Sequence, residues 1–262
     1  MFTSLTRPRA LALCALPVLA LLGVAGFAPL PFTIAQPGST ADVLGADKGR
    51  QVISVSGAPV RATKGKLLMT TIVATGPGTD IGAGDVVDAW FRTDRAVLPH
   101  DSVYPPGKSD AEVTKHNLAQ MAQSQHTAVR AALGYLGKKP GDVKVDLSLA
   151  RVGGPSAGLF FALGIVDKLD GDGAGGDLTG GRIIAGTGTI SPDGEVGAVG
   201  GVSLKTQAAR RDGATVFLVP KAECSGARAE LPAGLRLVPV TTLKDAVSAL
   251  RALNRGSAVP SC

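Results

Sequence analysis

A serine in a glycine-rich turn, followed by a long apolar run, constrains this 262-residue chain more than any other feature. The turn reads Gly153-Gly154-Pro155-Ser156-Ala157-Gly158, and the apolar run extends from Leu159 to Leu169. The run has the length and content of a buried helix, so the stretch predicts a strand, a sharp turn and a helix start. Free backbone N–H groups at a helix start can bind a developing oxyanion, which makes Ser156 a candidate nucleophile. An ordinary serine N-cap after a glycine-rich turn accounts for this stretch alone equally well.

Further motifs follow the serine in a set order. Residues 184–190 read Ile-Ala-Gly-Thr-Gly-Thr-Ile, residues 193–202 read Asp-Gly-Glu-Val-Gly-Ala-Val-Gly-Gly-Val, and Lys205 comes shortly after. Together with Pro-Ser-Ala-Gly around Ser156, these motifs resemble the proteolytic domain of the Lon proteases. Several motifs in one order are far more specific than a single serine-centred pentapeptide.

The N-terminal half narrows the resemblance. Segments 37–44, 65–72 and 121–125 are similar to the secreted, membrane-anchored Lon-like proteases of bacteria, which usually carry a PDZ domain. The resemblance implies an α/β fold of the Lon proteolytic type, like domain 2 of certain ribosomal proteins, with small mixed sheets packed by helices. Only residues 137–142 separate the predicted long helix from the next strand, which leaves no room for a PDZ domain and no inherited rule for substrate choice.

The resemblance also assigns roles at the site. It implies Ser156 as nucleophile, Lys205 as general base and Thr187 as the hydroxyl that holds the lysine amine, with Gly154, Pro155 and Ala157 forming the turn around the oxyanion hole. A serine hydroxyl needs a base, and a lysine can serve if burial keeps it neutral. None of the three histidines lies near a motif, so a Ser-His-Asp triad is rejected. A solvated surface lysine and a simple strand threonine are the alternatives for Lys205 and Thr187.

One position departs from the family pattern. Many Lon domains carry an acidic residue where this chain has Gly153. A glycine removes a possible ion-pair partner for the lysine, so the amine should be easier to keep neutral. The glycine also predicts that the entrance to the site differs in shape from that of those Lon domains.

The first 31 residues predict a signal peptide or a signal-anchor segment. Arg7 and Arg9 precede an uncharged stretch from Ala10 to Pro31, and the basic flank places the N-terminus in the cytoplasm and the remainder outside. By resemblance we expect an uncleaved, single-pass anchor, or a secreted protein if the leader is cleaved. The predicted domain order is 1–31 leader, 32–136 strand and long-helix region, 143–254 Ser-Lys proteolytic domain and 255–262 tail.

Hydrophobic periodicity and turn residues predict the remaining elements. Ser109 and Glu112 have the spacing of a capping box, which predicts a helix from residue 110 to about 136. Its expected buried stripe consists of Val113, Leu118, Met121, Val129 and Leu133. The other expected elements are strands at 51–55, 66–74, 143–149, 215–219 and 236–240, and helices at 84–91 and 241–253.

Composition and spacing exclude several classes of function. The net charge of +6 is spread thinly without basic and aromatic clusters, so nucleic acid is not expected as a partner. No metal-ligand spacing and no Walker loop occur, so neither a metal, a nucleotide nor another cofactor is expected. The acidic, glycine-rich segment 168–181 fails the EF-hand pattern and predicts a flexible surface loop. Cys224 and Cys262 are either a disulfide or two separate thiols.

Three functions compete at this point. The first is an ATP-independent serine endopeptidase that cleaves flexible or unfolded polypeptides outside the cytoplasmic membrane, for which a ring-shaped homo-oligomer is one expected form. The second is a binding or scaffold protein on the same fold with an idle site, because fold alone does not guarantee activity. The third is an esterase or amidase that acts on small molecules. The intact set of Ser156, Thr187 and Lys205 favours the first.

Overall fold

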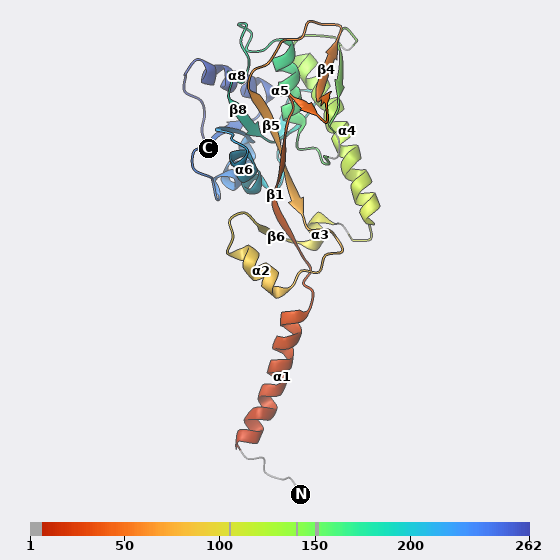
Figure 1. Ribbon diagram of the computed structural model, residues 1–262, viewed down its shortest axis with the longest axis vertical. Helices are drawn as coiled ribbons and strands as arrows, with labels where there is room; N and C mark the ends of the chain where they lie inside the picture. The colour runs from red at the N-terminus through yellow and green to blue at the C-terminus, as the bar shows by residue number, and fades with distance from the viewer. Residues whose placement is uncertain (1–6, 105, 140, 150–151) are drawn as a thin grey trace. The chain divides into compact units, whose positions relative to one another are not determined.

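The chain divides into two units, each described here by itself. The computed structural model describes residues 7–104, 106–139, 141–149 and 152–262 (Figure 1). Unit 1 consists of Met1–Gln36 and Ala74–Gly107, and unit 2 of Pro37–Val73 and Lys108–Cys262.

A largely parallel sheet organises unit 2. The strands follow the order β12, β11, β8, β5, β1, and β11 pairs in parallel with both β12 and β8, as β5 does with β8. Strands 66–74 and 236–240 were therefore predicted correctly, and the strand predicted at 215–219 is shifted by one residue. The bounds are β1 (Phe32–Asp42), β5 (Lys66–Ala74), β8 (Ile183–Gly186), β11 (Val216–Pro220) and β12 (Arg236–Val240).

Alternating side chains of this sheet pack into two separate apolar cores. Leu67, Met69 and Leu218 face helices α4 (Asp110–Tyr135), α5 (Gly158–Leu169) and α8 (Leu243–Asn254). Leu68 and Phe217 face α6 (Val202–Arg211) and α7 (Cys224–Arg228) on the opposite side. Successive residues of a strand point to opposite faces, so near-continuous apolar strands are what a sheet covered by helices on both faces requires.

Helix α4 begins as predicted but buries a different stripe. The Ser109 side chain accepts from the Glu112 N–H and the Glu112 carboxylate accepts from the Ser109 N–H, which confirms the capping box. The buried residues of α4 begin only at Met121, and Leu118 is 50% exposed, so its predicted burial was wrong. Helix α4 packs most extensively against α5, which has 12 residues against 26 in α4 and therefore covers only part of it.

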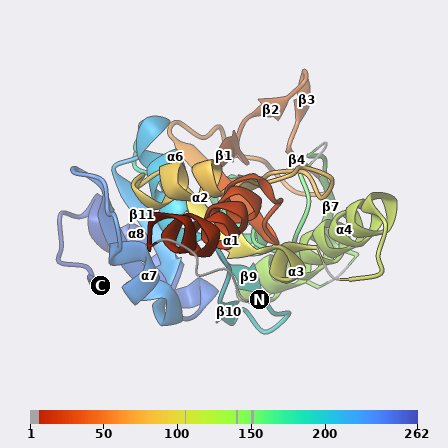
Figure 2. The same ribbon diagram turned by 90° about the horizontal axis from the view of Figure 1, so that it is seen from below.

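Short antiparallel pairs complete unit 2. The strands predicted near 51–55 and 143–149 form β4 (Ile53–Ser56) and β7 (Lys144–Leu147), which pair with each other. Strands β2 (Ala46–Asp47) and β3 (Arg50–Gln51) form a small hairpin that Figure 2 shows clearly. Strands β9 (Thr189–Ile190) and β10 (Val196–Gly197) pair next to the motif residues that follow Thr187.

The predicted flexible loop at 168–181 is pinned by an arginine. Helix α5 ends at Leu169, and residues 170–181, named here the acidic loop, follow it. The Arg61 guanidinium donates from Nη2 to the carbonyls of Gly175 and Gly176, at 2.6 and 3.1 Å. Leu178 and Thr179 are fully buried, so part of the segment is held in place, whereas its tip (residues 173–175) and its two ends (residue 170 and residues 180–181) are exposed. In the described part of the chain no cluster of His, Cys, Asp or Glu side chains could hold a metal ion.

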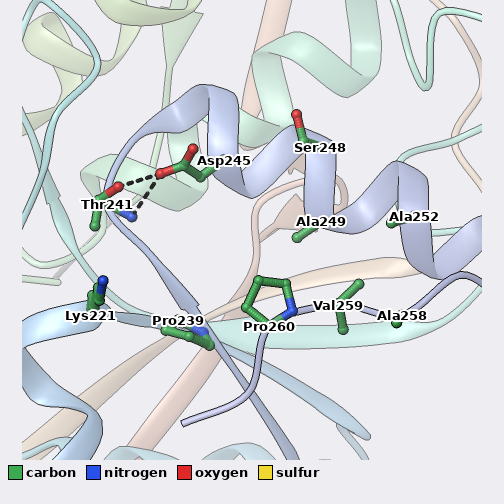
Figure 3. Close-up of a pocket in the computed structure, with 10 residues that line it drawn as sticks. All are labelled: Lys221, Pro239, Thr241, Asp245, Ser248, Ala249, Ala252, Ala258, Val259 and Pro260. Atoms are coloured by element: carbon green, nitrogen blue, oxygen red, sulfur yellow. Dashed lines mark hydrogen bonds between the residues drawn. The ribbon is translucent and has the colours of Figure 1, made fainter.

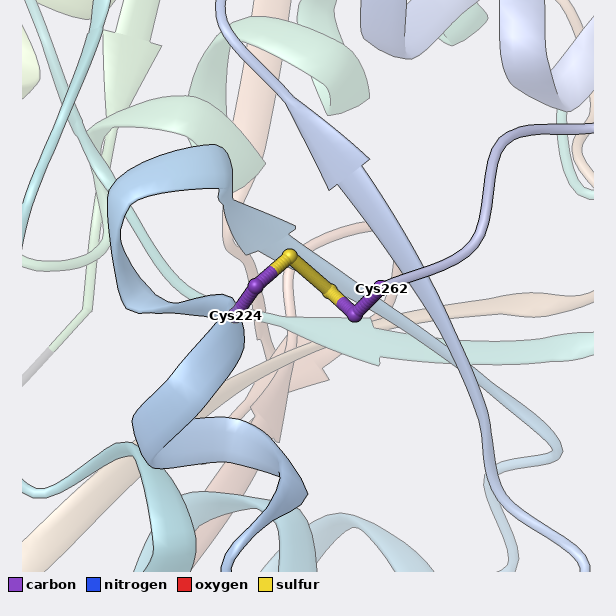
Figure 4. Close-up of a disulfide and its surroundings, with 2 residues drawn as sticks. All are labelled: Cys224 and Cys262. Atoms are coloured by element: carbon purple, nitrogen blue, oxygen red, sulfur yellow. A yellow bond between two sulfur atoms is a disulfide. The ribbon is translucent and has the colours of Figure 1, made fainter.

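The C-terminal tail packs against the rest of unit 2 and is linked to it covalently. Cys262 forms a disulfide with Cys224, the first residue of α7, with 5.3 Å between the Cα atoms (Figure 4). The Arg236 guanidinium donates to the Val259 carbonyl, and the Val259 side chain is buried. The pairing that the sequence left open is thus present.

Unit 1 contains the apolar leader and a small core of its own. It comprises α1 (Arg7–Phe27), α2 (Ala83–Trp90), β6 (Ala96–Pro99) and α3 (His100–Val103), with the first residues of β1 paired antiparallel to β6. Ile34, Ile81 and Ala89 form the core. The leader is helical as expected, but the membrane-anchor form of that prediction is not supported. No helix in the described part of the chain combines the length and the apolar character that a membrane span requires.

Candidate active site

The three predicted catalytic residues come from both faces of the sheet. Ser156 lies in the turn that leads into α5, and Lys205 lies on α6, on the opposite face. Thr187 directly follows β8, at the carboxyl end of that parallel strand. The carboxyl ends of parallel strands are where open α/β sheets usually place their ligand sites. The sheet therefore brings together residues that are far apart in sequence.

A chain of hydrogen bonds joins these residues. Lys205 Nζ donates to Thr187 Oγ1 at 3.1 Å, and Thr187 Oγ1 donates to the Ser156 carbonyl at 3.2 Å. The Gly188 N–H donates to the same carbonyl at 2.9 Å. Because the only proton of the threonine hydroxyl is used toward Ser156, Thr187 acts solely as an acceptor toward the amine. A neutral amine held this way keeps its lone pair free for another partner.

Burial lowers the proton affinity of the lysine. Lys205 is 4% exposed, and desolvation lowers the pKa of its amine from 10.5 to about 8, while the carboxylate of Glu223 opposes this effect. Removal from water disfavours the charged form of a lysine, so the neutral form is accessible near neutral pH. Lys205 is thus a buried lysine and not the solvated surface lysine that the sequence left as an alternative.

Ser156 and Lys205 line one cavity of about 270 Å³. Of the predicted turn residues, Gly154 and Pro155 also line it, whereas Ala157 is buried at the N-cap of α5. The other residues that line this cavity were not predicted from the sequence. Some of them lay within a predicted strand and some within the glycine-rich motif, but no residue-level signal singled them out. The additional lining residues are Thr71, Ile72, Gly153, Thr189, Ala198, Val199 and Gly200.

Two glycines allow the close approaches that form this cavity. A Cβ atom on Gly153 would lie 2.9 Å from the Cβ of Asn117 on α4, so a larger residue would displace the turn from that helix. Gly201, at the N-cap of α6, has φ +68°, and a Cβ there would lie 3.0 Å from Ile72. Left-handed φ is available to glycine at little cost. The position that is acidic in many Lon domains is thus a packing contact here.

A larger cavity elsewhere in unit 2 lacks the same chemistry. It measures about 370 Å³ and lies between α8, Lys221 and the C-terminal tail (Figure 3). Its carboxylate, Asp245, already accepts hydrogen bonds from Thr241 and Thr242 at the start of α8. The Ser248 hydroxyl has no buried lysine beside it among the residues that line this cavity. The smaller cavity therefore holds the candidate site.

Comparison with known proteins agrees with this geometry. Residues 89–251 match the Lon protease (S16) C-terminal proteolytic domain. The chain belongs to this family. It is 28% identical over 158 residues to a Lon protease of Roseiflexus castenholzii (strain DSM 13941 / HLO8), and 37% identical over 158 residues to a Lon protease of Clostridioides difficile (strain 630).

The family match covers one part of much longer relatives. The aligned segments cover 55% and 56% of this chain but only 18% and 19% of the two relatives. The chain thus spans less than a fifth of the length of the curated relatives it matches. The family assignment supports the mixed α/β fold and the Lon proteolytic type that the motifs predicted.

Proposed function

We propose that the chain is a serine endopeptidase in which Ser156 is the nucleophile and Lys205 the general base. The observation that carries the proposal is the buried amine of Lys205. Its pKa is lowered to about 8, and it donates a hydrogen bond to Thr187 beside the serine turn, residues 153–157. Catalytic lysines work best with a pKa near the operating pH, so the burial of this amine has a direct chemical use.

The first half of the reaction forms an acyl-enzyme. The Ser156 hydroxyl gives its proton to the lone pair of Lys205 Nζ, and its oxygen attacks the carbonyl carbon of the scissile peptide bond. The carbonyl oxygen becomes an oxyanion, which the backbone N–H groups at the start of α5 stabilise. The tetrahedral intermediate then collapses, and the Lys205 ammonium donates its proton to the departing amine.

The second half releases the acyl group with water. Lys205, neutral again, takes a proton from a water molecule that attacks the ester carbonyl, and it returns this proton to Ser156 Oγ. Thr187 stays hydrogen-bonded to the amine throughout and keeps Nζ from turning away from the serine. No step uses a metal or an organic cofactor.

The substrates we propose are flexible or unfolded polypeptides, cleaved without ATP. No Walker loop occurs in the sequence, and the helix–strand connection at residues 136–143 carries no inserted domain. Because the proposed cleavage uses no ATP, we expect the site to accept only segments that already fit in an extended form into its cavity of about 270 Å³.

An ATP-free digestion tests this proposal. Purified protein should cleave an unfolded polypeptide such as casein without nucleotide, whereas Ser156→Ala should show no cleavage above background. The appearance of new N-termini, followed by mass spectrometry, is the measurement. If wild type and Ser156→Ala were equally inactive on polypeptides and on short acyl esters, the scaffold function would replace this proposal. Ester cleavage alone would favour the esterase.

We further propose that unit 2 works outside the cytoplasm. The Cys224–Cys262 disulfide supports this location because such bonds persist mainly in oxidising compartments. Arg7 and Arg9, at the start of α1 and ahead of its apolar part, also fit an export leader. Protease added to intact spheroplasts should digest unit 2. If unit 2 were digested only after lysis, it would lie in the cytoplasm. Ring-shaped self-association stays a prediction that analytical ultracentrifugation can test.

A further inference from the structure

Helix α4 holds the serine turn at two adjacent points. The Gly154 N–H donates to the Asn117 carbonyl at 2.9 Å, and the Ser124 hydroxyl donates to the Pro155 carbonyl at 3.0 Å. Asn117 and Ser124 are seven residues apart, so they lie on one face of the helix. Helix carbonyls point toward the C-terminus and side chains tilt toward the N-terminus, so the two groups converge on the turn.

The contact with Ser124 is built into the packing of the site. Ser124 is 7% exposed and belongs to the buried face of α4. Gly158, the first residue of α5, lies so close that a Cβ atom there would sit 3.0 Å from Ser124 Oγ. The serine hydroxyl is therefore fixed between two helices, with the Pro155 carbonyl as its acceptor.

The orientation of the Pro155 carbonyl determines where the next N–H points. A peptide unit is planar and trans, so the Pro155 carbonyl and the Ser156 N–H point in opposite directions. A hydrogen bond that holds the carbonyl toward α4 directs the Ser156 N–H away from α4. The Ser156 carbonyl, held by Thr187 and Gly188, orients the Ala157 N–H in the same manner.

Of the residues that carry these two N–H groups, Ser156 lines the cavity, whereas Ala157 is buried. Among the described residues, neither the Ser156 nor the Ala157 N–H has a hydrogen-bond partner. Lys205 lines the same cavity as Ser156. Backbone donors of this kind stabilise an oxyanion only if their direction is set before the reaction.

We propose that Ser124 is a positioning residue that orients the Ser156 N–H and the nucleophile for attack on the substrate. It acts through the Pro155 carbonyl and touches neither the substrate nor Lys205. This inference rests on the proposed peptidase function. It adds a residue on α4 to a site otherwise formed by the sheet, α5 and α6.

The test compares two hydroxyl deletions on one helix. Ser124→Ala removes the bond to Pro155, and Ser109→Ala removes the N-cap of α4, which costs helix stability but lies 15 positions away along the chain. With wild type as reference, kcat and KM are measured on a short peptide substrate, and the midpoint of thermal unfolding is measured for all three. A peptide boronate that forms a tetrahedral adduct with serine reports on the oxyanion site separately.

We expect Ser124→Ala to lower kcat about ten- to hundredfold, because small misplacements of reacting groups cost this much. The affinity for the boronate should fall by a similar factor while KM changes little. Ser109→Ala should keep wild-type kcat and boronate affinity at a comparable loss of thermal stability. Equal kcat and boronate affinity in the two variants, or a loss confined to KM, would overturn the proposal.

Hydrogen exchange separates this inference from the proposed function. The backbone amides of residues 153, 154 and 156–158 should exchange faster in Ser124→Ala than in Ser109→Ala, whether or not the protein cleaves peptides. An inactive wild type would disprove the peptidase function. Equal exchange in the two variants would then also disprove the positioning role of Ser124.

Discussion

A buried ionisable side chain lies at each end of helix α5, but only one of the two lies beside a cavity. At the N-terminal end, Lys205 is buried beside the serine turn and its pKa is lowered to about 8. At the C-terminal end, Asp167 is fully buried, and desolvation raises the pKa of its carboxyl from 3.8 to about 6, aided by the nearby charges of Asp177 and Asp172. Both groups are therefore driven toward neutrality by the same cause, which is removal from water.

The surroundings of the two buried groups differ in the space that they leave for a reactant. The N-terminal end opens onto a cavity lined by a hydroxyl and backbone groups. At the C-terminal end, Asp167 accepts a bond from the Leu178 N–H at 2.7 Å, and the Arg61 guanidinium binds two carbonyls of the acidic loop. The Arg61 guanidinium is thus an internal cation that holds two carbonyls of the acidic loop. A perturbed pKa indicates function only where the site also has space for a reactant.

The largest expected difference between the two ends is in activity. Lys205→Arg should lower kcat/KM at least a thousandfold, because a guanidinium stays protonated at any usable pH and cannot accept the serine proton. In the wild type, kcat/KM should rise about tenfold per pH unit below pH 8 and level off above it, since only the neutral amine is active. Initial rates from pH 5.5 to 9.5 are the measurement.

The matched control is Lys168→Arg. Lys168 is a second buried lysine, and it lies near the C-terminal end of α5, away from Ser156. The Lys168→Arg variant should keep the wild-type profile. Substantial activity in Lys205→Arg would show that another group is the base and that the two ends do not differ as we describe.

The second expected difference is the direction in which stability depends on pH. The pKa of Lys205 is lower folded than unfolded, so its contribution is fully present above pH 10.5 and is lost as pH falls through about 8. The pKa of the Asp167 carboxyl is higher in the folded than in the unfolded protein. Its contribution to stability is therefore present below pH 3.8 and is lost as pH rises through about 6. At about 1.4 kcal/mol per pKa unit, each of these contributions amounts to about 3 kcal/mol.

Two neutral variants separate these effects. Lys205→Met should abolish the slope between pH 8 and 10.5, and should be more stable than wild type at pH 7 even after losing the Thr187 hydrogen bond. Asp167→Asn should abolish the slope between pH 4 and 6. Urea unfolding of each variant across the pH range is the measurement. If both variants kept the wild-type slopes, burial would not be the cause of either shift.

The smallest expected effect is that of removing the internal cation. Arg61→Ala should lower the free energy of unfolding by about 1–2 kcal/mol, because the carbonyls of Gly175 and Gly176 lose a charged donor. Catalytic constants should not change. Arg92→Ala, which removes an exposed pair with Asp94, is the control and should leave the free energy of unfolding nearly unchanged. A loss of activity in Arg61→Ala at full stability would mean that the acidic loop also serves the reaction.

Local patterns were sufficient to predict much of the fold and to name the candidate residues of the site, whose catalytic roles stay a prediction. Alternation and apolar content predicted β5, β11 and β12, and the capping box predicted the start of α4. Such signals are readable because they depend on residues within a few positions of one another. The motif order likewise singled out Ser156, Thr187 and Lys205, and the structure places all three around one hydrogen-bonded chain.

Contacts between distant segments were beyond the reach of the sequence. The exposure of Leu118, the hydroxyl of Ser124 against the serine turn and the Ile72 wall of the cavity all depend on where α4 and β5 pack. The acidic loop reads as flexible because the arginine that holds it lies more than a hundred positions earlier. The sequence by itself determined which residues can react. Only the tertiary structure decided which are desolvated, because burial and hydrogen-bond partners are set by segments that meet in space.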